Sequence, residues 1–572
     1  MDSSKKISYF VKLKSRVQTL YKSLSPERVL LFWSLVALSV TLIFSALIVF
    51  NNRFLITTPT YGGTVREGII GTPRFINPVL ATSDQDKDLT TLVYAGLTKK
   101  DTLGHTELDM AKSITESDDQ LHYSVVLKDN AKFHDGEKVT ADDIIYTIAL
   151  IQSPAIKSPY RIEWEGVSIE KESDTEFTFS LKKPYPQFMV ALTLGILPKH
   201  IWKNLTEEQI SLSDYNIHAI GSGPYKISSI ATNSGIPNTF VLKAYENYTR
   251  GRPYIDTFVI STYQNEKYLI QAFQNGDIDR LYGISPEKVA SLQIPANNIH
   301  TSLLPRTFAV FFNPNKDSIL SDKNVRLALH MAINKQAIVN TVLKNYGKVI
   351  NDPYPFDEDI TASVYNVDQA RTLLESNKAL KKASSTLEIT LTTANTDEMK
   401  KVAEMIKNDW EAIGVHTTLA VYEVSDLNQT VIKDRDFQVL LFGSITQDPS
   451  DLYAFWHSSQ RTYPGLNISN YVSKKLDTNL ETLRTSENEL SRISAYEDVK
   501  KEFSEEVPGI FLFAPSLIYI TRDKITSPLP LYSFNNSSRF TLIESWYRYT
   551  DSVWPKTYSK SVIAFLEKII HY

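Results

Sequence analysis

The longest apolar run in the chain, VLLFWSLVALSVTLIFSALIVF, occupies residues 29–50 and contains no charged side chain. At 1.5 Å per residue this run spans about 33 Å as a helix, enough to cross a hydrocarbon core of about 30 Å. A cleaved signal peptide is the alternative, but its apolar region usually has only about 7–15 residues. The following FNNRFL also lacks a small-x-small cleavage site. The pattern therefore predicts an uncleaved transmembrane anchor.

Beyond this run, period-two and helical patterns alternate along the chain. TLEITLTTA (386–394) alternates as a strand, and an apolar stripe at helical spacing follows, with Thr396 as N-cap and Gly414 as terminator. VHTTLAVYEV (415–424) and FQVLLFG (437–443) have the composition of the next strands. GTVREGII (63–70) reads as an edge or opening strand. This alternation predicts an α/β fold, whose ligands tend to lie at the carboxyl ends of strands.

Charge and cysteine content restrict where such a domain works. Residues 1–28 carry seven Lys or Arg against two acidic side chains, and the chain as a whole has a net charge of −4. The remainder is therefore acidic, which argues against nucleic-acid binding. A basic flank favours a cytoplasmic N-terminus and places residues 51–572 outside the cell membrane. The absence of cysteine excludes disulfides, a thiol nucleophile and a lipidated cysteine.

The sequence carries no recognisable catalytic motif. H-E-x-x-H, G-x-G-x-x-G, the P-loop pattern and G-x-S-x-G are all missing, and the ten histidines form no ligand cluster. The segment FHDGEKVTADD (133–143) is the strongest candidate for a metal or acid/base site, because His134 lies close in sequence to four acidic residues. Asp135-Gly136 suits a tight turn, and Thr140 with Asp143 forms a T-x-x-D capping pattern, so a scaffold role is expected rather than a metal site. We expect no enzyme activity, no cofactor and no metal.

Several segments resemble, in order, the extracellular solute-binding proteins of the peptide/nickel type, which serve ATP-driven importers. The resemblance covers about residues 60–548. The segments that carry it are PRFINPVLATSDQDKDLTTLVYAGLTKKD (73–101), LKDNAKFHDGEKVTADDIIYTI (127–148), GSGPYKI (221–227), VRLALHMAINKQAIV (325–339) and ISAYEDVKKEFSEEVPGIFLF (493–513).

The resemblance implies a periplasmic-binding-protein-like fold of two α/β lobes on a hinge, with a subdomain inserted into lobe I. Two chain crossings between the lobes would allow closure around a ligand. The expected organisation is a cytoplasmic basic segment (1–28), the transmembrane helix (29–50), a linker (51–59), lobe I (60–304, with the insertion at about 98–219), lobe II (305–515), a return to lobe I (516–548) and a C-terminal tail (549–572).

The resemblance also implies ligand-binding positions. Main chain at Thr82, Ser83 and Asp84 corresponds to the family segment that pairs with a peptide backbone. After the lobe II strand, Ser444 stands where peptide binders often carry an Asp for the amino terminus. Asp448 or Asp451 could serve the amine instead, although Asp448-Pro449 also suits a plain turn. Further candidates at the cleft are Tyr453, Phe455, Trp456 and Ser516, although aromatic residues at this spacing are more often core.

The resulting hypothesis is a membrane-anchored, monomeric protein that captures peptides outside the cell and delivers them to permease subunits, with the ATPases on separate chains. The alternatives are a binder of another solute, such as an oligosaccharide or a metal chelate, and a surface sensor on the same fold. In the tail, Val562, Ile563, Leu566, Ile569 and Ile570 form an amphipathic face that would pack on lobe I or rest on the membrane.

Overall fold

The computed structural model describes residues 25–101, 104–185, 187–357, 365–383, 386–486, 488–530 and 535–553. It contains two compact units. One comprises residues 1–60 with 549–572, and the other comprises residues 61–548.

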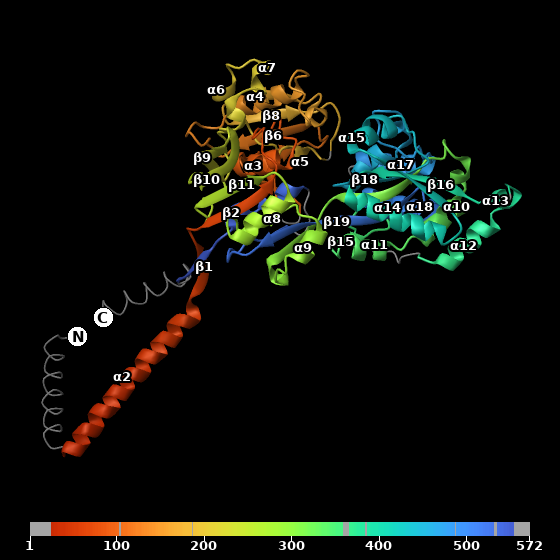
Figure 1. Ribbon diagram of the computed structural model, residues 1–572. Coiled ribbons are helices and arrows are strands. Elements are labelled where there is room, and N and C mark those ends of the chain that lie inside the picture. Colours follow the sequence, from red (N-terminus) through yellow and green to blue (C-terminus); the bar gives the residue numbers. More distant parts are fainter. Residues whose placement is uncertain are drawn as a thin grey trace. The chain divides into compact units, whose positions relative to one another are not determined.

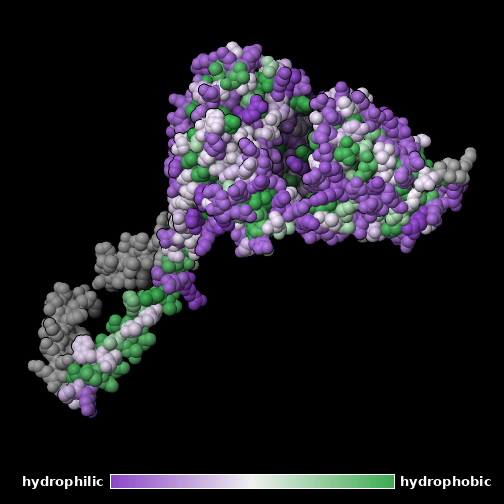
Figure 2. Space-filling view, in the orientation of Figure 1, coloured by the Kyte–Doolittle hydropathy of each residue, from purple (hydrophilic) through white to green (hydrophobic). Residues whose placement is uncertain are grey.

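The first unit contains a long apolar helix and a two-stranded ribbon. Helix α2 (Pro26–Phe54) has Pro26 at its first turn, and its length and hydropathy suit a membrane span. Most of its large apolar side chains are exposed, as its hydrophobic surface in Figure 2 shows. The expected linker at 51–59 is different in the structure: the helix runs on to Phe54, and Ile56–Thr60 forms strand β1. This Thr-rich strand pairs antiparallel with β20 (Tyr549–Val553). The amphipathic face predicted at 562–570 lies outside the described residues.

The second unit is built on a twelve-stranded mixed sheet (Figure 1). Its order is β17-β16-β18-β14-β19-β12-β2-β11-β10-β9, with β13 and β15 pairing along β19. The strands are β2 (Thr64–Ile70), β9 (Tyr225–Asn233), β10 (Ile236–Ala244), β11 (Thr257–Tyr263), β12 (Arg280–Tyr282), β13 (Ile299–Leu303), β14 (Arg306–Phe312), β15 (Gly347–Val349), β16 (Glu388–Ala394), β17 (His416–Tyr422), β18 (Val439–Ile445) and β19 (Gly509–Thr521). Strand β2 opens the unit but is not an edge, because it pairs with β11 on one side and β12 on the other.

Strand β19 belongs to both halves of this sheet. Its first part pairs with β14, and its second part pairs with β13 and β12. Side chains of the first part, such as Leu512, enter a core that contains β14, whereas Tyr519 enters a core that contains β2. We call the half with β2, β9–β13 and the end of β19 lobe I, and the half with β14–β18 and the start of β19 lobe II. The chain passes between them near Leu304 and again within β19.

Helices pack on the two lobes, and a smaller sheet is inserted in lobe I. The inserted sheet has the order β5-β6-β8-β7, and β3 and β4 form a separate hairpin. These strands are β3 (Thr98–Lys100), β4 (Thr106–Leu108), β5 (Ala111–Glu116), β6 (His122–Leu127), β7 (Ser168–Lys171) and β8 (Glu176–Ser180). The longer helices are α3 (Asp84–Val93), α4 (Ala141–Gln152), α8 (Glu266–Asn275), α10 (Lys323–Ala332), α12 (Val367–Ser376), α14 (Asp397–Glu411), α17 (Lys474–Thr485) and α18 (Glu489–Glu506).

The strand–helix–strand unit predicted from residue 386 onward is present. Strands β16 and β17 are parallel, and α14 connects them. The Thr396 hydroxyl accepts from the Met399 amide, and Gly414 has a positive φ of 86° after the helix. Strand β18 is parallel to β16 and has its carboxyl end at Ile445, where the next loop begins.

Candidate functional site: a cavity lined by both lobes

A cavity of about 570 Å³ lies within the second unit and takes its walls from both lobes. The space-filling view shows a hollow between the two halves (Figure 2). This volume is in the range of pockets that bury most of a small organic ligand. Lobe I contributes residues of α3, β3 and the inserted subdomain, and lobe II contributes Ile445, Gln447, Asp448, Asp451, Ala454 and Phe455. A third set, Asn535, Ser537, Ser538 and Thr541, comes from the segment that returns to lobe I.

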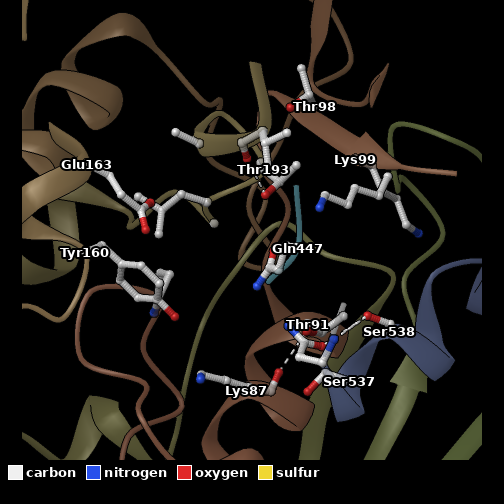
Figure 3. A pocket seen from close by; sticks show the side chains of 18 of the residues that line it. Lys87, Thr91, Thr98, Lys99, Tyr160, Glu163, Thr193, Gln447, Ser537 and Ser538 are labelled. Carbon is white, nitrogen blue, oxygen red and sulfur yellow. Dashed lines mark hydrogen bonds between the residues drawn. The ribbon is translucent and has the colours of Figure 1, made fainter. Parts of the chain in front are cut away.

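Helix α3 forms one wall of the cavity. Its N-cap Ser83 accepts from the Asp86 amide at 3.2 Å, and the Asp86 carboxylate accepts from the Ser83 amide at 3.4 Å. Lys87 and Thr91 project from the helix beside Ser537 and Ser538 (Figure 3). The capping box fixes where the helix begins, and so fixes the position of this wall.

A buried ionic network fastens α3 to the returning segment. Arg539 is fully buried and contacts Glu67 of β2 and Asp88 of α3, each at 2.7 Å. The hydroxyl of Ser537 also donates to Asp88 at 2.7 Å, and Asn536 donates to Asp84 at 2.6 Å. Burial raises the pKa of Glu67, and the nearby Arg539 guanidinium opposes that rise. These contacts hold two walls of the cavity together.

The opposite walls combine β3 with the inserted subdomain. Lys99 enters from one side of the close-up view, and Tyr160 with Glu163 enters from the other (Figure 3). The Lys99 ammonium is paired with Glu544 at 2.8 Å. The Glu163 carboxylate makes no hydrogen bond or ion pair with any described residue. These walls therefore present charged side chains together with the Tyr160 ring.

The lobe II contribution is a capped turn after β18. Asp451 accepts through one oxygen from the amides of Gln447 and Asp448, at 2.8 and 3.0 Å. Asp448 accepts from the amide and hydroxyl of Ser450, at 2.9 and 2.6 Å, and lies 3.5 Å from Arg492. Both carboxylates thus hold the turn and also line the cavity. Asp448 can therefore stabilise the turn and contact a ligand at the same time.

Charged groups of the two lobes influence one another across the cavity. Loss of hydration lowers the pKa of Lys100 to about 8, against the opposing effects of Asp451 and Asp448. Burial, and secondarily the neighbouring Asp448, raises the pKa of Asp451. The pKa of Glu163 is raised first by loss of hydration and then by Asp451. Asp451 therefore lies within electrostatic reach of both Lys100 and Glu163.

The candidates Thr82, Ser83, Asp84, Ser444 and Ser516 do not line this cavity. Thr82, Ser83 and Asp84 precede or begin α3, next to Ala81, which does line it. The N–H and the C=O of Thr82 make no hydrogen bond with another described residue. Both main-chain groups can therefore pair with a ligand. Ser444 is paired with Thr307 inside the sheet, and Ser516 is paired with Leu303 at the crossing strand.

The aromatic candidates after Asp451 have different environments. Phe455 lines the cavity. Tyr453 stacks on His457 with ring centroids 4.2 Å apart and lies under the Arg484 guanidinium. Trp456 is 2% exposed and stacks on Phe311, which places it in the core of lobe II. Of these three aromatic residues, only Phe455 lines the cavity. Trp456 lies in the hydrophobic core, which is the more common environment for aromatic residues at this spacing.

The segment FHDGEKVTADD joins the inserted subdomain to the GSGPY motif. The ring of His134 accepts from the Gly221 amide at 3.3 Å and donates to the Gly223 carbonyl at 3.1 Å. The Asp143 carboxylate accepts from the Thr140 amide at 2.9 Å, in the expected capping arrangement. Within the described residues, no group of three or more His, Cys, Asp or Glu side chains is placed to hold a metal ion.

Sequence reasoning missed Lys100, Glu163, Tyr185 and the serines of the returning segment. Lys100 ends a three-residue strand, and Glu163 sits in the short helix Arg161–Trp164. No motif or spacing distinguishes them from other charged surface residues. Lys100 and Glu163 share a cavity with Asp451 only because segments more than 280 positions apart in the sequence meet there.

Comparison with known proteins agrees with this architecture. The family model described as "Bacterial extracellular solute-binding proteins, family 5 Middle" matches residues 105–464. The oligopeptide-binding protein AppA of Bacillus subtilis is 28% identical over 80% of this chain and 87% of its own length. The dipeptide-binding protein of Escherichia coli is 22% identical over 82% of this chain and 93% of its own length.

Solved structures show the same fold. AppA of Bacillus subtilis in complex with a nonapeptide superposes with a TM-score of 0.64 at 27% identity, covering 86% of this chain and all of that one. CtaP of Listeria monocytogenes, an ABC transporter substrate binding protein, reaches a TM-score of 0.73 at 25% identity with the same coverage. With two lobes, a crossing strand, a cavity lined by both and a family match over more than half of its length, the chain belongs to the bacterial extracellular solute-binding proteins of family 5.

Proposed function

We propose that this protein captures peptides outside the cell and delivers them to an ATP-driven importer, without chemical turnover. The observation that carries the proposal is the 28% identity over 80% of the chain to a protein named for oligopeptide binding. The polar cavity between the lobes supports it, because a ligand held by both lobes favours their closed arrangement. The partners would be permease subunits, with the ATPases on separate chains, and the binding protein would act as a monomer.

The peptide main chain would pair with the segment Thr82–Asp84, where the Thr82 peptide group is unused by the described residues. Backbone pairing supplies affinity that does not depend on side-chain identity. The amino terminus would lie near Asp448 and Asp451, which line the cavity from lobe II. Helix α2 would tether the domain to the cell membrane.

Native mass spectrometry of the full chain in nanodiscs, mixed with a pool of tri- to hexapeptides, tests this function. We expect adducts at peptide masses. Changing Asp448 and Asp451 together to Asn keeps an oxygen for each cap but removes both charges, so adducts should weaken by about tenfold or more. Asp434→Asn, an exposed acid outside the cavity, is the matched control. Adducts of another solute in place of peptides would contradict the proposal and identify the alternative ligand.

A further inference from the structure

The two-stranded ribbon of the first unit brings the end of the described chain back to helix α2. Strand β1 begins at Ile56, two residues after the helix ends at Phe54. The antiparallel register pairs Ile56 with Val553, the last residue of β20. Strand β20 therefore runs toward the helix. The tail that follows it, residues 554–572, starts beside the end of the helix.

The proposed membrane span sets the depth of this starting point. The uncharged run 29–50 is followed within α2 by the polar residues 51–53 and by Phe54. These four helical residues add about 6 Å beyond the hydrocarbon core, which is the depth of the lipid headgroups. The paired Ile56 and Val553 come next, and both are apolar and exposed, by 47% and 38%. The tail therefore begins at the lipid–water interface.

The sequence of the tail has the pattern of an interfacial helix. At helical spacing, five apolar side chains share one face, namely Val562, Ile563, Leu566, Ile569 and Ile570. Lys560, Ala564 and Lys568 fall on the opposite side of the same helix. Trp554 and Tyr558 precede the apolar face, and both residue types favour the membrane interface. A segment with this division binds a lipid surface with its apolar face down.

The ribbon itself benefits from such an attachment. Strand β20 is exposed along its whole length, and β1 is exposed at its first two residues. A two-stranded ribbon on its own is marginally stable in water. Strand β1 is fixed at this end by α2, whereas no described residue follows Val553 on β20. A tail held by lipid would fix the second strand at the same end of the ribbon.

We propose that residues 554–572 form an amphipathic helix that lies in the lipid–water interface where the ribbon begins, as a second membrane attachment beside α2. This inference rests on the proposed membrane tether and does not depend on which ligand the lobes bind. The register of β1 with β20 favours the membrane over lobe I as the partner of the apolar face, because it starts the tail beside α2. Attachment at two points would also limit rotation of the ribbon about a single helix.

The absence of cysteine allows a single spin label to be placed without background. The full chain is reconstituted in vesicles of equal parts phosphatidylcholine and phosphatidylglycerol. Power saturation then compares accessibility to oxygen, which enters lipid, with accessibility to a water-soluble nickel chelate. Labels at Ile563→Cys and Leu566→Cys should favour oxygen over the chelate by about fivefold or more relative to a label at Ala564→Cys, because only the first two lie on the apolar face.

A label at Leu38→Cys, inside the apolar run of α2, is the control for the tether and should report the lipid interior whatever the tail does. Labels at 563 and 566 that are shielded from both reagents would place the apolar face against protein. Labels that reach the chelate as readily as the one at 564 would leave the tail in water. Either result, with Leu38→Cys in lipid, would overturn the second attachment and leave the tether intact. A label at Leu38→Cys that reaches the chelate would overturn the tether, and the second attachment with it.

Discussion

The carboxylates of Asp448 and Asp451 accept backbone and hydroxyl hydrogen bonds within the turn after β18, and both face the cavity. His134 is similar in that its ring serves the fold, through the backbone of Gly221 and Gly223. The turn and capping patterns around it predicted a scaffold role rather than a metal site, and its contacts join two segments of lobe I. The role of each of these residues thus depends on the groups with which its side chain forms hydrogen bonds in the folded protein.

Protonation of His134 should make the protein sensitive to acid. Burial lowers its ring pKa to about 4, whereas an unfolded chain has a histidine pKa of about 6.5. Between these values the unfolded state binds a proton that the folded state does not, so stability falls as pH drops through this window. In His134→Gln, thermal melting measured between pH 7 and 4 should depend less steeply on pH than in the wild type.

The exposed His122, whose ring lies 3.0 Å from the Ser180 hydroxyl, provides the control. His122→Gln should follow the wild-type pH profile of the melting temperature. If His134→Gln also retained the wild-type slope, the ring of His134 would not be the group that titrates.

Three elements of lobe I, namely β2, α3 and the segment Asn536–Phe540, depend on one another through Arg539. Each is short or polar, and their mutual packing positions two walls of the cavity. Tyr519 of β19 and Tyr282 of β12 donate to the same carboxylates, Glu67 and Asp88, at 2.5 and 2.6 Å. The crossing strand is thus joined to this network.

Arg539→Met should destabilise the protein strongly. Removing the guanidinium leaves Glu67 and Asp88 buried without a counter-ion, which typically costs about 3–5 kcal/mol. Arg539→Lys should cost less, because it keeps the charge but loses the fork that contacts both acids. Urea unfolding at neutral pH measures both changes. A loss below about 1 kcal/mol for Arg539→Met would show that the two carboxylates find other partners.

Across the molecule, β19 is the strand on which both lobes are built, and the cavity depends on residues from both sides of it. The expected crossings near 304 and 515 fall between β13 and β14 and within β19. In the other unit, β1 and β20 pair the segment after α2 with the end of the described chain. This pairing was not anticipated, because a Thr-rich stretch resembles a linker until its partner strand is known.

Retention of α2 should make the mature protein an integral membrane protein. After expression in a bacterial host, we expect the chain to stay with membranes after alkaline washing and to have the intact mass of 64.9 kDa. The physical reason is the cost of moving the uncharged apolar run 29–50 of this helix out of the bilayer. A soluble product that lacks residues 1–50 would show instead that the segment is a cleaved signal sequence.

The sequence by itself determined the α/β class, the apolar helix, the strand–helix–strand unit from residue 386 and the family to which the ordered motifs belong. These features follow from local periodicity, capping residues and short motifs, which act over a few positions. Only the tertiary structure decided which residues share the cavity. Asp451, Glu163 and Lys100 meet because β19 and the returning segment bring distant parts of the chain together, and no local pattern records that distance. Phe455 and Trp456 are neighbours in the sequence, but Phe455 faces the cavity and Trp456 lies in the core. The orientation of their helical turn in the folded protein determines this difference.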